Sequence, residues 1–152
     1  MFLLFTLVNV FPPIGVHPSQ LQKYKSAIDE AKETFTCFSD KKIISLKKLN
    51  DGYPDCADGS DEPGTSTFLN GTFYCQNKGY IPKIIPKWSV GDGICDCCDG
   101  SDEAFNKHVH CPNTCAKAEK ERIQIFEKLE SIIKEGMQIH EMREKEGKEK
   151  LK

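Results

Sequence analysis

Two short stretches of this chain carry carboxylates at a density that requires a counter-charge. Each stretch places five acidic side chains within twelve residues. Four of each set are candidate metal ligands: Asp51, Asp55, Asp61 and Glu62 in the first, and Asp92, Asp96, Asp102 and Glu103 in the second. Carboxylates this close repel one another unless a cation lies between them. Ligand sets made only of oxygen favour a hard ion, and calcium is the usual hard ion in secreted modules. The sequence therefore predicts two Ca²⁺ sites.

Other residues of the two stretches have predictable parts in these sites. Tyr53 and Ile94 each lie two residues after the first aspartate, where a backbone carbonyl can join the metal shell. Asp58 and Asp99 each open an Asp-Gly-Ser step. Their carboxylates are expected to accept local backbone N–H groups in turns, and they are therefore left out of the ligand sets.

Three other interpretations of the acidic stretches fit less well. The segment Asp51–Glu62 has the span of an EF-hand loop, but Cys56 stands where that loop needs glycine and Tyr53 where it needs Asp or Asn. Cys95 and Cys98 form one CxxC step without the second pair that zinc modules usually have. Plain solvated turns would explain one acidic stretch better than two copies with equal spacing.

The cysteines indicate an oxidising compartment. The chain has eight, and all lie between Cys37 and Cys115. An even number packed into one segment is typical of a disulfide framework in a secreted domain. Sequence alone leaves about 105 ways to pair eight cysteines.

Two further features predict passage through the secretory pathway. Residues 1–15 are expected to be a signal peptide, because residues 1–11 are almost continuously apolar and Pro12 and Pro13 then break the run. That run is too short to span a bilayer as a helix. Asn70 opens an Asn-Gly-Thr glycosylation sequon in a loop rich in Gly, Ser and Thr.

The cysteine-rich segment contains an internal repeat that must position the acidic stretches. Each copy begins with Thr-Phe-x-Cys and ends with Asp-Gly-Ser-Asp-Glu. Two copies of one small unit explain this better than one continuous fold. The density of Gly, Pro and Asp predicts short strands, turns and single helical turns. The expected organisation is a signal peptide, a polar lead-in, two repeats and a charged tail, at 1–15, 16–36, 37–74, 75–115 and 116–152.

The tail is expected to be helical. Residues 116–133 lack Gly and Pro, and their apolar side chains recur at helical spacing among alternating Lys and Glu. Ile125, Ile132 and Ile139 are seven residues apart, as in a coiled-coil seam, but Gly136 interrupts it. The favoured expectation is an amphipathic helix that frays beyond Gly136.

These motifs carry a family resemblance. The pattern Cys-x-Asp-Gly-Ser-Asp-Glu resembles the calcium-binding LDL-receptor class A repeat. The tandem arrangement over about residues 15–135 resembles the N-terminal domain of the glucosidase II beta subunit family. The motifs that carry it are Asn50-Asp51-Gly52, Asp58-Gly59-Ser60-Asp61-Glu62-Pro63-Gly64-Thr65 and Gly91-Asp92-Gly93-Ile94-Cys95-Asp96-Cys97-Cys98-Asp99-Gly100-Ser101-Asp102-Glu103. The resemblance implies a small, disulfide-rich, calcium-stabilised fold of two class A-like modules followed by a helix.

The resemblance also implies a function and a set of ligands. Such a subunit is not an enzyme. It pairs with a catalytic alpha subunit in the lumen of the endoplasmic reticulum, where the heterodimer trims glucose from N-linked glycans. The implied calcium ligands are the Lys48 and Tyr53 carbonyls with Asp51, Asp55, Asp61 and Glu62, and the Ser89 and Ile94 carbonyls with Asp92, Asp96, Asp102 and Glu103.

The cysteine pairing follows from the resemblance in the same way. The implied bridges are Cys37–Cys56, Cys75–Cys97, Cys95–Cys111 and Cys98–Cys115. The chain departs from the family at Pro54 and Phe68, where the family has cysteines. Loss of this one bridge predicts a less rigid first module that holds calcium more weakly.

Two other classes of function remain to be weighed. An extracellular class A module that binds a ligand is the main alternative. An enzyme could use Cys111 near His108 and His110 as a nucleophile, but Cys111 is expected to be disulfide-bonded. Paired carboxylates could suggest a glycosidase, but they are better explained as calcium ligands. Trp88, the single tryptophan, lies beside the second acidic stretch and fits either a partner-binding anchor or a core residue. The formal net charge of -2 argues against a nucleic-acid interface.

Overall fold

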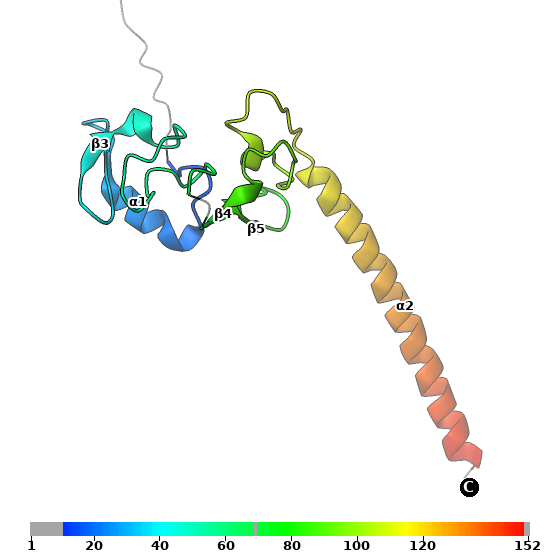
Figure 1. The fold of residues 1–152 in the computed structure, drawn as a ribbon. Coiled ribbons are helices and arrows are strands. Elements are labelled where there is room, and N and C mark those ends of the chain that lie inside the picture. Colours follow the sequence, from blue (N-terminus) through cyan, green and yellow to red (C-terminus); the bar gives the residue numbers. More distant parts are fainter. Residues whose placement is uncertain (1–10, 69, 151–152) are drawn as a thin grey trace, which may run out of the picture.

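The computed structural model describes residues 11–68 and 70–150 and contains two small lobes followed by one long helix (Figure 1). Most of the predicted signal peptide, residues 1–10, lies outside the described residues. The elements in chain order are η1 (Pro18–Gln20), α1 (Leu21–Ala27), β1 (Ile28–Asp29), β2 (Thr34–Thr36), β3 (Ile43–Ser45), η2 (Leu46–Lys48), β4 (Thr72–Cys75), β5 (Lys83–Pro86), η3 (Lys87–Ser89), η4 (Ser101–Glu103) and α2 (Cys115–Lys150). The prediction of short strands and single helical turns within the cysteine-rich segment is confirmed.

The first module packs α1 against a small antiparallel sheet with the strand order β1-β2-β3. Phe35 on β2 is fully buried, and the Tyr24 ring of α1 lies over it with a centroid distance of 5.9 Å. The Tyr24 hydroxyl donates to the Ser60 carbonyl at 2.9 Å, which links the helix to the first acidic loop. Segment 16–36, expected as a polar lead-in, therefore supplies much of the first core.

The second module is built on β4 and β5, which pair antiparallel with Phe73 opposite Ile85. These two side chains and Val90 are buried together around the Cys75–Cys97 bridge. So small an apolar core cannot hold a domain together without cross-links. The second module accordingly contains three of the four disulfides.

The four bridges are the pairs that the resemblance implies, Cys37–Cys56, Cys75–Cys97, Cys95–Cys111 and Cys98–Cys115, with Cα atoms 4.9 to 5.7 Å apart. In the second module Cys111 lies against Gly100, whose Cβ, if present, would be 2.7 Å from Cys111 Cβ. In the first module the ring of Phe68 lies against Gly59 in the same way, at 2.3 Å. An apolar ring therefore occupies the place of the missing bridge.

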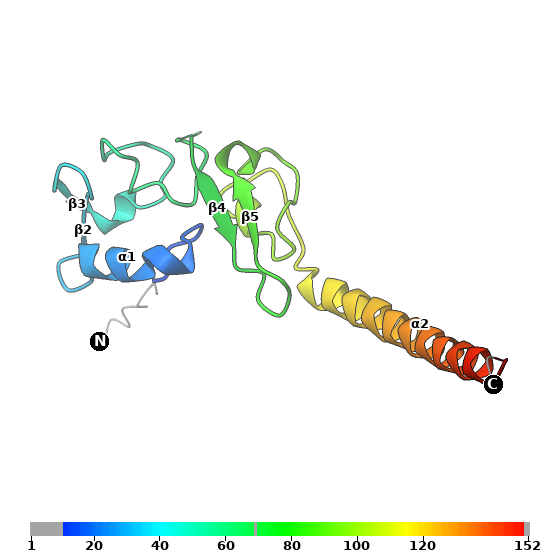
Figure 2. The same cartoon turned by 90° about the horizontal axis from the view of Figure 1, so that it is seen from below.

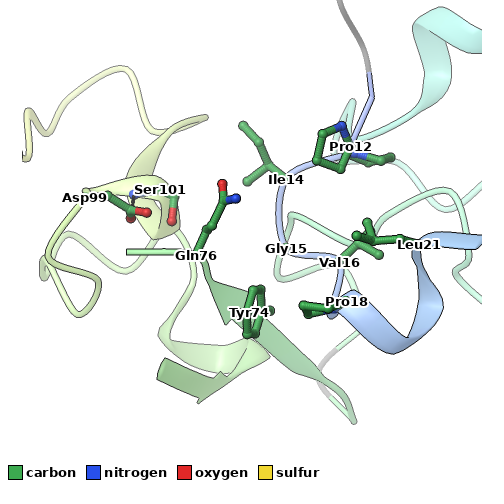
Figure 3. A pocket seen from close by; sticks show the side chains of 11 residues that line it. Pro12, Ile14, Gly15, Val16, Pro18, Leu21, Tyr74, Gln76, Asp99 and Ser101 are labelled. Atoms are coloured by element: carbon green, nitrogen blue, oxygen red, sulfur yellow. Dashed lines mark hydrogen bonds between the residues drawn. The ribbon is translucent and has the colours of Figure 1, made fainter. Parts of the chain in front are cut away.

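The chain just before the first module forms the seam between the modules. Phe11 packs on the first core, and Pro13 and Val16 are buried. Gly15 forms an antiparallel bridge with Tyr74 of β4, whose N–H donates to the Gly15 carbonyl at 3.0 Å. Figure 3 shows this segment with Tyr74 on one side. Residues on both sides of the expected boundary at residue 15 therefore contact the modules.

Helix α2 runs away from both modules as a single rod (Figures 1 and 2). The Cys98–Cys115 bridge ties its first residue to the second module. The expectation that it frays beyond Gly136 is wrong, because the helix continues to Lys150. One glycine costs only about 1 kcal/mol in a helix, and the Lys- and Glu-rich turns on either side outweigh it. None of the described helices is both long and apolar enough to cross a membrane.

Replacement of Gly15 by alanine tests the seam. Gly15 has a φ of +86°, and a Cβ there would lie 2.4 Å from the Pro63 carbonyl oxygen. Gly79 has a φ of +90° with nothing within 4 Å, and it therefore serves as a matched control. Gly79→Ala is expected to lower the free energy of unfolding by about 1 kcal/mol, and Gly15→Ala by about 3 kcal/mol. Urea unfolding of the oxidised protein measures both, and equal losses would contradict a close-packed seam.

Candidate functional site

The two acidic loops have the same backbone shape. Asn50 and Gly91, the residues before the first aspartate, both adopt left-handed conformations, with φ of 60° and 73°. Gly52 and Gly93, the residues after it, do so as well, with φ of 86° and 91°. The repeat that the sequence predicts is therefore also a repeat in conformation.

The centre of each loop is a buried aspartate. Asp61 and Asp102 are almost completely inaccessible to solvent. One carboxylate oxygen of Asp61 accepts the N–H of Asp55 at 2.6 Å, and one of Asp102 accepts the N–H of Asp96 at 2.6 Å. The other oxygen of each carboxylate is buried and has no hydrogen-bond partner. A buried anionic oxygen without a partner is costly, and a cation would offset that cost.

The glutamate that follows each aspartate is buried too. Glu62 accepts the N–H groups of Asp51 and Gly52 at 3.1 Å and also the Thr65 hydroxyl. Glu103 accepts the Asn106 side-chain amide at 2.8 Å through one oxygen, while its other oxygen is buried without a partner. These donors hold the glutamates in place and leave part of the acceptor capacity free.

Lysine side chains approach the middle aspartates from outside the loops. Lys48 Nζ lies 2.7 Å from one oxygen of Asp55, whose other oxygen is buried and unpartnered. Lys42 donates to the Asp55 carbonyl at 2.8 Å, and Lys83 donates to the Asp96 carbonyl at 3.0 Å. Sequence reasoning named Lys48 only for its backbone carbonyl. It missed Lys42 and Lys83, although they occupy the same position in the repeat.

The outer aspartates close the loops. Asp51 and Asp92 are exposed, and each accepts the N–H two residues further on, from Tyr53 at 2.9 Å and from Ile94 at 2.8 Å. The Tyr53 and Ile94 side chains point to solvent, with 67% and 65% of their surface exposed. Tyr53 and Ile94 therefore contribute to the loops through their backbone groups and not through their side chains.

Electrostatics shows that the loops hold their negative charge at a cost. Burial raises the pKa of Glu62 to about 7, and the neighbouring Asp51 adds to the rise. Burial also raises the pKa of Asp102. Both shifts mean that the charged carboxylate is disfavoured where it stands. A divalent ion at either loop would restore the charged form.

The residues present fit a hard cation in some respects. Among residues 11–68 and 70–150, no three His, Cys, Asp or Glu side chains form a group that could hold a metal ion. The donors are carboxylate oxygens, the type of ligand that calcium prefers. The buried carboxylate oxygens without partners belong to the predicted ligands Asp55, Asp61, Asp102 and Glu103.

The two aspartates left out of the ligand sets do what was expected of them. Asp58 accepts the Ser60 N–H at 3.2 Å, and Asp99 accepts the Ser101 N–H at 3.0 Å. Asp99 also accepts the Asn77 N–H at 2.8 Å. The prediction that these side chains serve turns is confirmed.

Other predicted site residues lie on the surface. Trp88 is 63% exposed, so the interpretation of Trp88 as a core residue is wrong. Asn70 of the sequon is exposed. His108 and His110 are exposed as well, and Cys111 is disulfide-bonded and has no free thiol.

Comparison with known proteins gives one consistent result. The model of the family described as PRKCSH-like, Glucosidase II beta subunit-like, matches residues 3–152. The glucosidase 2 subunit beta of Schizosaccharomyces pombe is 48% identical over 127 residues, which cover 84% of this chain and 24% of that protein. The Homo sapiens protein of the same name is 43% identical over 132 residues, which cover 87% and 24%. The chain thus spans about a quarter of the length of these relatives.

A solved structure is similar in fold. It is the crystal structure of an ER glucosidase II heterodimeric complex that consists of the catalytic subunit and the binding domain of the regulatory subunit. The match has a TM-score of 0.57 and 36% identity, and it covers 69% of this chain and 98% of the chain in that structure.

The raised pKa of Glu62 predicts how stability depends on pH when a chelator is present. Between its ordinary value of 4.5 and about 7, the folded protein binds a proton at Glu62 that the unfolded chain does not. This group is therefore expected to stabilise the fold as pH falls from about 7 to 4.5, by about 2 kcal/mol. Chemical unfolding of the wild type and Glu62→Gln at both pH values measures the contribution. An identical pH dependence in both proteins would contradict it.

Proposed function

Because the chain belongs to the glucosidase II beta subunit-like family, we propose that it is the non-catalytic binding domain of a regulatory beta subunit and that it binds a glucosidase II catalytic alpha subunit. The observation that carries this proposal is the similarity to the binding domain in the heterodimeric complex. The likeness covers 98% of the chain in that complex, so it extends over the binding domain as a unit.

The proposed setting is the lumen of the endoplasmic reticulum. There the heterodimer would trim glucose from N-linked glycans, and this domain would contribute attachment rather than catalysis. Four disulfides fit an oxidising compartment. A signal peptide at the N-terminus and a glycan on the exposed Asn70 belong to the same proposal.

We further propose that the modules are class A-like and that each binds one Ca²⁺. The first ion would take Asp51, Asp55, Asp61, Glu62 and the carbonyls of Lys48 and Tyr53; the second would take Asp92, Asp96, Asp102, Glu103 and the carbonyls of Ser89 and Ile94. A bound calcium would supply positive charge that offsets carboxylate repulsion. The buried oxygens without partners and the raised pKa values of Glu62 and Asp102 support this proposal.

Trp88 is the proposed anchor for the partner. It is exposed, as are other large apolar side chains of the second module, among them Ile84 and Ile94. Exposed aromatic residues on a rigid support are typical of the residues that dominate binding energy. The first module has Lys47 at the corresponding position, so this surface belongs to the second module alone.

The proposal also includes the helical tail, α2. The apolar side chains of α2, such as Ile125 and Leu129, are exposed, and a coiled-coil contact through them is proposed.

An extracellular class A module that binds a ligand is less favoured, because the similarity extends over both modules in tandem.

Calcium is expected to control binding to the alpha subunit. The oxidised chain should retain an alpha subunit from an extract of the endoplasmic reticulum in calcium and lose it in a chelator. Asp102→Asn should weaken calcium uptake at the second loop about tenfold in isothermal titration, since one charged ligand is lost. Asp58→Asn is the control, because Asp58 lies outside the ligand sets. If the chain retained the alpha subunit equally well in the chelator, the role of calcium would be refuted. If it retained no alpha subunit in calcium, the proposed partner would be refuted.

Trp88→Ala is expected to weaken binding to the alpha subunit about tenfold or more while calcium uptake stays unchanged. Ile43→Ala removes an equally exposed apolar side chain, 68% against 63%, from the first module and is the matched control. Surface plasmon resonance measures the first quantity and isothermal titration the second. Equal losses in the two variants would argue against an anchor at Trp88.

A further inference from the structure

Lys87 is a buried charged residue at the seam between the modules. It opens η3 in the second module, where its backbone N–H donates to the Gly71 carbonyl at 3.0 Å. Its side chain is only 6% exposed and crosses to the first module, where the amine donates to the backbone carbonyl of Glu62. One residue of the second module is therefore bonded directly to the first acidic loop.

Comparison of the repeats shows that the fold of a module does not need this lysine. The corresponding residue of η2 is Leu46, which packs against the first core. A buried amine bonded to a carbonyl costs more free energy than a leucine would at the same place. What Lys87 adds is a directed hydrogen bond between modules, which an apolar side chain cannot make.

The surroundings of Lys87 are suited to hold its charge in one place. Its aliphatic stem passes over Gly71, where a Cβ would lie 3.2 Å from Lys87 Cδ. Burial lowers the pKa of Lys87, while the carboxylates of Glu62 and Asp61 raise it. The first loop thus provides the carbonyl that accepts the Lys87 amine, and its carboxylates oppose part of the effect of burial on the Lys87 pKa.

Other contacts across the seam come from the chain just before the first module. Gly15 forms a bridge with Tyr74, and the His17 ring lies against the Tyr74 ring with a centroid distance of 5.1 Å. A pocket of about 280 Å³ at the seam is lined by residues of both modules, including Gly15, Pro63, Gly71 and Lys87. Lys87 adds to these contacts a bond that reaches the first acidic loop itself.

We propose that Lys87 is a positioning residue, which docks the second module on the first acidic loop and thereby fixes the place of Trp88. The two residues are adjacent within η3, so an anchored Lys87 leaves the Trp88 side chain little freedom to shift relative to the first module. This inference rests on the proposed function for the part played by Trp88. The docking of the modules is independent of any partner.

The first test measures docking without a partner. Residual dipolar couplings are recorded on the oxidised chain in calcium for the wild type, Lys87→Met and Lys42→Met. Methionine keeps the stem and removes the donor. Lys42 also donates to a loop carbonyl, that of Asp55, but within one module. One alignment tensor should fit both modules in the wild type and in Lys42→Met, and two should be needed in Lys87→Met. A single tensor in Lys87→Met would overturn the inference.

The second test measures affinity for the catalytic alpha subunit. Lys87→Met should weaken binding about tenfold, and Lys42→Met less than about twofold. If Lys87 acts through Trp88, then Trp88→Ala should cost much less in the Lys87→Met background than in the wild type. Additive losses would overturn the positioning role. If the wild type binds no alpha subunit, the proposed function fails, and the dipolar couplings still decide whether Lys87 docks the modules.

Discussion

The structure depends on the burial of acidic side chains in modules that have little else to bury. Asp61 and Asp102 are nearly inaccessible, and each gives one oxygen to the backbone of its own loop. A buried carboxylate that is only half satisfied is unfavourable without a counter-charge. The loops are therefore shaped by the burial of these carboxylates, and the strands and bridges serve as their frame.

The two modules meet this need with different cross-links. In the second, the Cys95–Cys111 bridge holds the residue next to Asp96, one of the proposed ligands. In the first, Pro54 and Phe68 replace such cysteines, and the Phe68 ring lies on Gly59 instead. Packing of a ring constrains a loop less than a covalent bond does. The ion pair between Lys48 and Asp55, at 2.7 Å, adds a second, weaker restraint. In the second module Ser89 replaces Lys48, and Asp96 pairs with Lys83 at 3.4 Å.

The repeat made much of this structure predictable from the sequence. The recurring Asp-Gly-Ser-Asp-Glu pattern identified the modules, and the turn-forming aspartates Asp58 and Asp99 followed from local chemistry. The seam could not be predicted, because it joins residues distant in sequence. Gly15 contacts Tyr74, and Lys87 contacts Glu62, and neither contact leaves a periodic signal. The prediction that the helix frays beyond Gly136 was wrong because it gave one helix-breaking glycine more weight than the helix-forming residues around it.

The differences between the repeats also indicate how the modules divide their tasks. At three successive positions the first module has Leu46, Lys47 and Lys48 where the second has Lys87, Trp88 and Ser89. In the first module Leu46 packs against the core, and the Lys48 amine pairs with Asp55 of the same module's acidic loop. The second set turns its lysine to the neighbouring module and exposes an aromatic ring instead. The same three positions of the repeat thus serve the core and loop of the first module, and in the second they serve the seam and the exposed surface.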